Sequence, residues 1–119
     1  MAAIYSKVLV LVLLFIGEGL SIYAEMIGAK NNYVASQPFL QIFLKMLLLI
    51  ALAGGFLIAG YMLGFNAFKN IWIVSVASIT SILIVEPILA WTIFHQIPTI
   101  GTIIGFILGA IGLFLSIFY

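Results

Sequence analysis

Four apolar stretches, each long enough to cross a bilayer, set the architecture of this chain. The hydrocarbon core of a membrane is about 30 Å thick, and a helix of about 20 residues spans it. Each stretch is apolar on every side, and a helix satisfies all its own backbone hydrogen bonds in lipid. We therefore predict an all-α membrane protein, a single domain over residues 1–119, with transmembrane helices at about 8–28, 39–64, 71–94 and 100–118.

The composition leaves little material for a soluble domain. The chain has 119 residues, of which 66% are hydrophobic and 6% charged, whereas soluble domains have about 25% charged residues. A net charge of +1 gives no reason to expect a nucleic-acid partner. There is no Cys, the one His has no partner for a metal, and no catalytic or cofactor motif stands out. We expect a multi-pass protein of the cell (plasma or inner) membrane that is not an enzyme and has no cofactor.

Short polar connections predict an up-down-up-down bundle. Both termini then lie on one side of the membrane, side A, and the first and third connections lie on side B. Lys7 and Lys69 belong to side A, while Lys30 and Lys45 belong to side B. Positive residues normally select the cytoplasmic side, so this even division leaves both orientations open.

All three acidic residues fall inside the predicted spans. A carboxyl group in hydrocarbon is costly and by default marks a substrate path or a proton site. Glu18 lies about ten residues from either end of its span, with no lysine at a matching depth. We expect it to bind a proton or a cation. Glu25 and Glu86 lie nearer side B, and their structural alternatives are an ion pair with Lys45 for Glu25 and a hydrogen bond for Glu86.

Serines extend the candidate site. Ser21 lies on the helical face that carries Glu18 and Glu25, and two serines share a face with Glu86 in the third span. That face can line a path beside the first helix. Alternatively, hydroxyls in lipid bond to their own helix or to a neighbour. The candidate substrate- or proton-binding residues are Glu18, Glu25, Glu86, Ser21, Ser75 and Ser78.

The fourth span carries a glycine at every fourth position: Gly101, Gly105 and Gly109. Stripes of small residues let membrane helices approach closely. We expect this stripe to pack a dimer, either a homodimer or a heterodimer. Some small residues also serve packing within one chain, and the stripe of Ala51, Gly55 and Ala59 is the second candidate for the dimer contact.

The second half of the chain resembles a known family. Residues 84–99, with Glu86-Pro87 in a helix, followed by Gly105 and Gly112, resemble the C-terminal part of the EamA domain of the drug/metabolite transporter superfamily. His95-Gln96 stands where that pattern usually has Gly-Glu. The chain is also similar to the small multidrug resistance family, although that family's aromatic and glycine signature at the start of the third helix is missing. The matching pieces are Ala24-Glu25-Met26-Ile27-Gly28, Ala90-Trp91, Phe94-His95-Gln96 and Ile103-Ile104-Gly105.

The resemblance implies a small secondary transporter that works as a dimer and exports a small or lipophilic substrate in exchange for protons. Glu18 or Glu25 would be the membrane-embedded carboxylate, the third helix would line the path, and the fourth would hold the dimer. One alternative is a flippase subunit for a polyprenyl-linked sugar or another lipid. The other is an accessory or scaffold protein that transports nothing.

Overall fold

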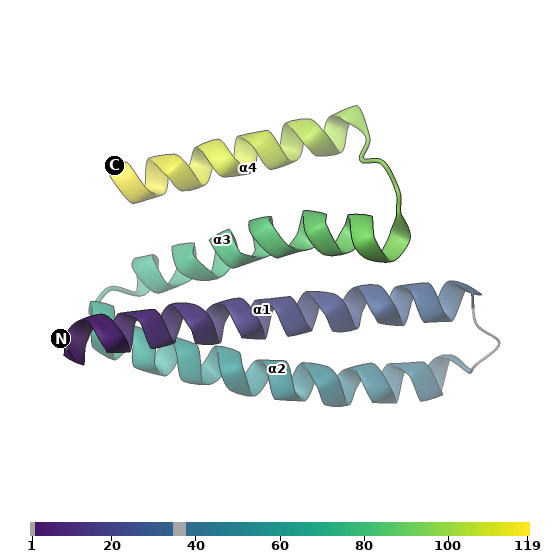
Figure 1. Cartoon of the computed structure of the whole chain (residues 1–119), viewed down its shortest axis with the longest axis horizontal. Coiled ribbons are helices and arrows are strands. Elements are labelled where there is room, and N and C mark those ends of the chain that lie inside the picture. The colour runs from purple at the N-terminus through teal and green to yellow at the C-terminus, as the bar shows by residue number, and fades with distance from the viewer. Residues whose placement is uncertain (1, 35–37) are drawn as a thin grey trace.

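A computed structural model describes residues 2–34 and 38–119 (Figure 1). Within these ranges the chain forms helices and no strand: α1 (Ala2–Val34), α2 (Phe39–Phe68), α3 (Ile71–Leu89), the π-helix η1 (Ala90–Phe94) and α4 (Ile100–Phe118). In the described part of the chain, four segments are long and apolar enough to cross a membrane, with η1 completing the third. The prediction of an all-α, multi-pass membrane protein is therefore confirmed.

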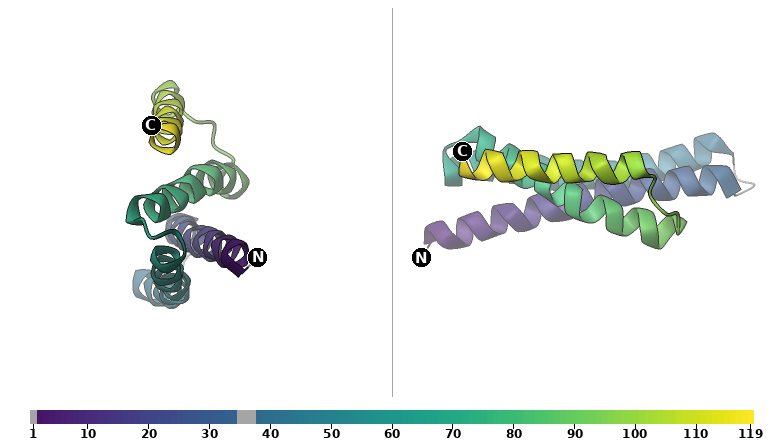
Figure 2. Two further views of the ribbon diagram at one scale, coloured as in Figure 1. Left: turned by 90° about the vertical axis from the view of Figure 1, so that its left-hand side faces the viewer. Right: turned by 90° about the horizontal axis from the view of Figure 1, so that it is seen from above.

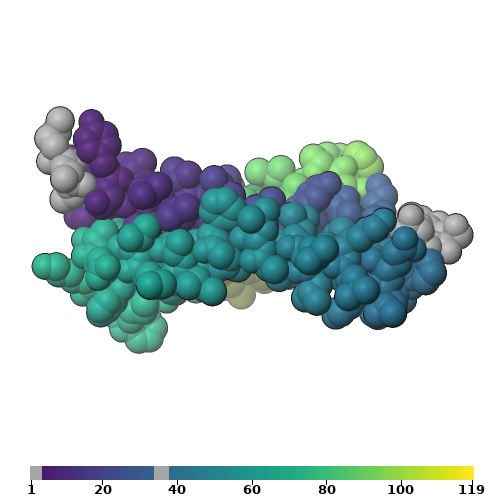
Figure 3. All heavy atoms as spheres, turned by 90° about the horizontal axis from the view of Figure 1, so that it is seen from below, coloured from purple at the N-terminus to yellow at the C-terminus, as the bar shows by residue number. Residues whose placement is uncertain are grey.

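The helices form a row with alternating directions. Along the row the order is α4, α3, α1 and α2, as Figure 1 and the end-on view in Figure 2 show. Both termini and the turn between α2 and α3 lie at one end, which corresponds to side A, and the other two connections lie at side B. From below, side chains of α2 cover most of the visible face (Figure 3), and many of these are exposed large apolar side chains. Such a surface suits lipid.

The first two helices are longer than the predicted spans. α1 begins at Ala2 and continues through the polar residues after Gly28 to Val34, and α2 continues past Gly64 to Phe68. Hydropathy locates the part of a helix in hydrocarbon, whereas a helix continues beyond it until a residue stops it. Lys69 ends α2 in the left-handed conformation (φ 57°). The predicted connection through residues 35–37 lies outside the described residues.

Glycines bring α1 and α2 into close contact. A Cβ atom on Gly60 would lie 2.8 Å from Leu14 Cδ2, and one on Gly17 would lie 2.7 Å from Leu57 Cδ2. A Cβ on Gly64 would lie 3.0 Å from both Val10 Cγ1 and Val74 Cγ2. An added Cβ would force the facing leucine to shift at Gly17 and Gly60, and it would fit only tightly against the two valines at Gly64. The core of the bundle forms at this contact, where the buried side chains are Val10, Leu14 and Val74.

α4 is attached much more loosely. It contacts only α3 among the described helices, and none of its residues, all of them described, is buried. Thr99 caps its N-terminus, where the Thr99 hydroxyl accepts a hydrogen bond from the backbone N–H of Thr102. In the end-on view α4 stands at the far end of the row (Figure 2).

The third span changes its helical form after Pro87. Proline has no N–H, so the carbonyl of Leu83 loses its usual helical donor. The chain continues as the π-helix η1 from Ala90 to Phe94. The Thr92 hydroxyl donates to the carbonyl of Ile88 at 2.8 Å, within this transition. His95 then ends the helix with a φ of 55°. The predicted single span 71–94 is thus helical throughout, but in two forms.

Candidate functional site

Glu18 lies at the middle of α1 and meets a buried hydroxyl of α3. The Oγ of Ser78 donates a hydrogen bond to Glu18 Oε1 at 2.5 Å. Ser78 is 3% exposed, and Glu18 is half-buried. α1 and α3 run in the same direction (Figure 1), so this bond ties two parallel helices together, at the middle of α1 and in the side-A half of the span Ile71–Phe94. Within the described ranges, no other carboxylate makes a side-chain hydrogen bond.

The other hydroxyls of α3 behave differently. Thr80 donates to the carbonyl of Val76, and Ser81 donates to that of Ala77, each four residues earlier in the same helix. This is the ordinary role of a hydroxyl in an apolar helix. Ser78 instead donates its hydroxyl hydrogen to Glu18 on the neighbouring helix α1. α3 therefore contains both predicted arrangements. Ser78 bonds to the neighbouring helix α1, whereas Thr80 and Ser81 bond to the backbone of their own helix.

The remaining predicted serines take no recorded part in this contact. Ser21 and Ser75 are both within the described residues and half-buried, but neither makes a recorded side-chain hydrogen bond. Ser21 follows Glu18 by one helical turn. The structure thus brings Glu18 and Ser78 together and leaves Ser21 and Ser75 as neighbours along the helices.

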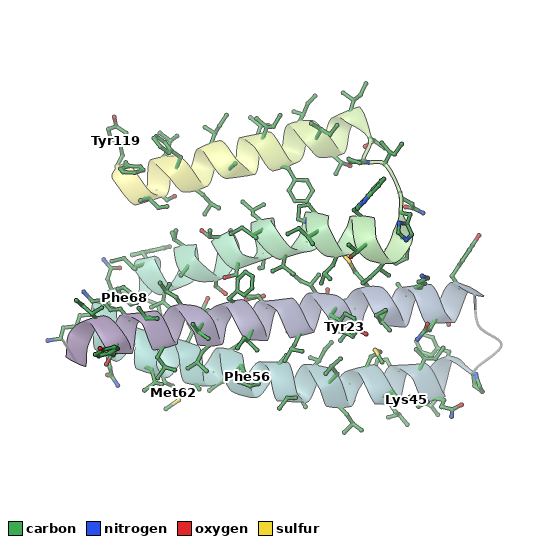
Figure 4. All side chains as sticks on the ribbon, in the orientation of Figure 1. Tyr23, Lys45, Phe56, Met62, Phe68 and Tyr119 are labelled. Carbon is green, nitrogen blue, oxygen red and sulfur yellow. The ribbon has the colours of Figure 1, made fainter. Side chains whose placement is uncertain are left out.

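Glu25 faces a different part of the molecule. It is exposed and lines a hollow between α1 and α2 on side B, together with Gly28, Phe39, Met46 and other residues. Lys45 does not line this hollow, and the described residues include no recorded ion pair between Glu25 and Lys45. Figure 4 shows Lys45 toward the side-B end of α2.

The register of α1 and α2 explains this separation. Gly28 packs on Met46, where a Cβ would lie 3.0 Å from Met46 Cγ. Because the helices are antiparallel, Lys45 then lies level with Ala29 and Lys30. That is about one turn, roughly 6 Å, beyond Glu25. The alternative of an ion pair between Glu25 and Lys45 assumed similar depths for the two residues, because positions counted from the ends of the spans carry no information on register.

Glu86 lines a groove between α3 and α4. The groove has a volume of about 650 Å³ and also contains Trp91 of η1 and Thr102 and Phe106 of α4. Pro87 and the π-helical turn shape its wall on the α3 side. The three carboxylates therefore occupy three separate environments: a helix contact for Glu18, the α1–α2 hollow for Glu25 and the α3–α4 groove for Glu86.

The predicted dimer stripe is mostly unoccupied within this chain. A Cβ on Gly105 would meet nothing within 4 Å, and one on Gly101 only the hydroxyl of Thr99 at 4.0 Å. On Gly109 it would be 3.7 Å from Leu83 of α3, an ordinary packing distance. Gly109 therefore faces α3 of the same chain, while Gly101 and Gly105 leave room for another molecule.

Two lysine contacts were not anticipated from the sequence. Lys30 Nζ donates to the carbonyl of Ile93 at 2.9 Å, across from α1 to the end of η1. Lys7 Nζ lies 5.6 Å from the ring centroid of Phe68, and Figure 4 labels Phe68 at side A. Lys7 and Lys30 lie eleven and twelve residues from Glu18, which places them toward the two ends of α1, but this spacing does not indicate their partners.

The site thus consists of Glu18, held between the parallel helices α1 and α3, and Glu86, which lies in the groove on the α4 side of α3. In hydrocarbon such a carboxyl can be neutralised by a proton or by a cation, and exchange between the two would couple their movements. No family model, no curated protein and no solved structure matches this chain.

Proposed function

We propose that this protein is a subunit of a small secondary transporter in which Glu18 binds a proton and the substrate in turn. The observation that carries the proposal is the hydrogen bond from Ser78 to Glu18. It joins the carboxyl group at the middle of α1 to a second helix, so a change at the carboxyl alters how α1 and α3 hold together. Proton coupling requires a group that binds the proton or the substrate and also contacts the helices that rearrange, and Glu18 would be such a group between α1 and α3.

The substrate class follows from the charge of this site. Glu18 has no lysine or histidine among its recorded polar partners, which within the described residues consist of Ser78 alone. An ionised Glu18 therefore favours a cation, and its apolar surroundings favour one with apolar groups. We propose export of a small lipophilic cation in exchange for protons.

We also propose that two copies work together. Four helices in a row leave Glu18 between only two of them, and a path needs walls on the remaining sides. Gly101 and Gly105 provide a face of α4 on which a second copy can pack closely. A partner there would also cover a helix that has no buried residue of its own.

The test uses the purified protein in liposomes that contain a pH-sensitive dye. Tetraphenylphosphonium added on one side serves as the lipophilic cation. The wild-type chain should move protons in the opposite direction, and Glu18→Gln should remove this exchange because the neutral amide cannot release a proton. Ser78→Ala should slow the exchange about tenfold, since loss of a hydrogen bond to a charged group is worth about 1.5 kcal/mol or more.

Ser81→Ala is the matched control, because Ser81 is also buried on α3 but bonds to its own backbone. It should transport like the wild type.

Glu25→Gln is the second comparison. If Glu25→Gln loses exchange and Glu18→Gln keeps it, the working carboxylate is Glu25. If the wild type exchanges no protons with any cation in a panel of apolar amines and phosphonium ions, proton coupling is wrong. The flippase and accessory-protein alternatives then take its place.

A further inference from the structure

A polar hollow opens on side B where the end of α1 meets the end of η1. Its lining residues are Lys30, Tyr33, Ile93, Phe94, His95 and Gln96. None of these described residues is acidic. The ammonium group of Lys30 has three N–H donors, and one of them donates to the carbonyl of Ile93. Two donors and a positive charge therefore remain for an anion in this hollow.

The depth of Lys30 matches that of lipid phosphates. It lies twelve residues beyond Glu18 along α1, which is about 18 Å of helix. Half of a hydrocarbon core is about 15 Å. With Glu18 at the midplane, the ammonium group therefore lies just outside the hydrocarbon, where the phosphate groups are. Tyr33 and Trp91 lie at the same end, and aromatic residues of this kind favour the membrane interface.

An apolar groove leads away from the same hollow. Gln96 lines both the hollow and the α3–α4 groove. Beyond the turn the groove is mainly apolar, with Leu83 of α3 and Phe106, Ile107 and Ala110 of α4 among its lining residues, although Glu86 also lines its α3 wall. Its volume of about 650 Å³ lies in the range of small-molecule sites, about 300–1,000 Å³. A cationic end at the phosphate level thus continues into a groove that runs toward the midplane.

We propose that this hollow and groove together bind one anionic phospholipid. The phosphate accepts hydrogen bonds from Lys30, with Gln96 and His95 beside it, and one acyl chain lies between α3 and α4. The lipid fills the space beside a helix that packs on α3 alone. Lys30 also donates to Ile93, so the phosphate and the end of η1 share one ammonium group. This site is separate from Glu18 and does not rest on the proposed transport activity.

Trp91 provides a direct probe of the groove. The chain has two tryptophans, so Trp72→Phe leaves Trp91 as the single fluorophore. The protein is placed in phosphatidylcholine bilayers, and brominated phosphatidylglycerol or brominated phosphatidylcholine is added as the quencher. We expect the anionic lipid to occupy the site about tenfold more tightly, which corresponds to one charge-assisted hydrogen bond. Equal quenching by the two lipids would overturn the proposal without any further variant.

Lysine variants test where the selectivity arises. Lys30→Gln should remove most of the tenfold preference, and Lys30→Arg should retain it. Lys45→Gln is the matched control, because Lys45 lies level with Lys30 on α2 and lines neither the hollow nor the groove. It should lower the preference by at most about fivefold, the effect of a general surface charge near anionic lipid. Equal losses in Lys30→Gln and Lys45→Gln would show surface attraction only and would contradict the site.

Two further probes separate the phosphate from the acyl chain. Brominated diacylglycerol lacks the phosphate and should quench Trp91 no better than phosphatidylcholine. Inorganic phosphate at millimolar concentration should not displace phosphatidylglycerol. Displacement by inorganic phosphate would instead assign the hollow to a free anion.

Ala110→Phe fills the groove and should weaken phosphatidylglycerol binding while Lys30 stays unchanged. Unaltered binding in this variant would exclude the groove as the place of the acyl chain.

Discussion

The glycines of α2 and those of α4 are similar in the sequence but have different surroundings. Gly60 and Gly64 of α2 face α1: an added Cβ on Gly60 would force buried Leu14 to shift, and one on Gly64 would lie only 3.0 Å from buried Val10. Gly105 and Gly112 of α4 face open space, where an added Cβ would touch nothing within 4 Å. The same residue type at a similar spacing therefore serves a closed contact in one region and a free face in the other.

This difference shows that spacing of small residues identifies a face able to pack but not the partner that packs there. Even within α2 the outcome varies, because Gly55 meets nothing while Gly60, five residues later, meets Leu14. The stripe of Ala51, Gly55 and Ala59 therefore remains a second candidate for contact between chains. The following substitutions compare the packed region of α1, α2 and α3 with the region of α4 and its turn. The free energy of unfolding is measured by circular dichroism in mixed micelles that contain sodium dodecyl sulfate.

The largest change in stability is expected for Gly64→Leu. A Cβ at this position already lies 3.0 Å from Val10 and Val74, which are both almost completely buried. A leucine must separate α1, α2 and α3 at their core, so the free energy of unfolding should fall by about 3 kcal/mol. A loss below about 1 kcal/mol would mean that this contact adapts readily, and the contrast with α4 would then disappear.

His95→Gly should have a smaller effect of the opposite sign. His95 has a φ of 55° at the turn toward α4, and this left-handed conformation costs a residue with a Cβ roughly 1 kcal/mol. Glycine adopts it freely, so the free energy of unfolding should rise by about 0.5–1 kcal/mol. Lys69→Gly is the matched variant in the packed region, since Lys69 has a φ of 57°. A decrease in stability for both variants would contradict the left-handed assignment of these residues.

The smallest change in stability is expected for Gly105→Leu. Its added side chain meets open space in the single chain, so the free energy of unfolding of the monomer should change by less than about 0.5 kcal/mol. Association should respond instead, because leucine fills the face that a second copy would approach. Cross-linking through a cysteine introduced at Ile104 measures this. Unchanged cross-linking would move the dimer contact away from α4, with Gly55→Leu the next variant to compare.

The sequence determined the number and approximate position of the membrane helices. Hydropathy belongs to each residue separately, and a backbone in lipid has to satisfy its hydrogen bonds within its own helix. The same argument placed Glu18 near the middle of its span. Helix ends were less predictable, because α1 continues through the polar residues Lys30 and Asn31, beyond the part of the helix that hydropathy identifies.

Only the tertiary structure decided how the helices face one another. The sequence placed Ser75, Ser78 and Glu86 on one face of α3, but Ser78 reaches Glu18 while Glu86 lines the groove toward α4. Glu25 and Lys45 differ in depth because Gly28 meets Met46, a consequence of the register between two antiparallel helices. Rotation and register depend on side chains that are distant in sequence and fit together only after the helices have formed. Hydropathy is nearly uniform around these helices, so it carries no information on which face of one helix meets which face of another.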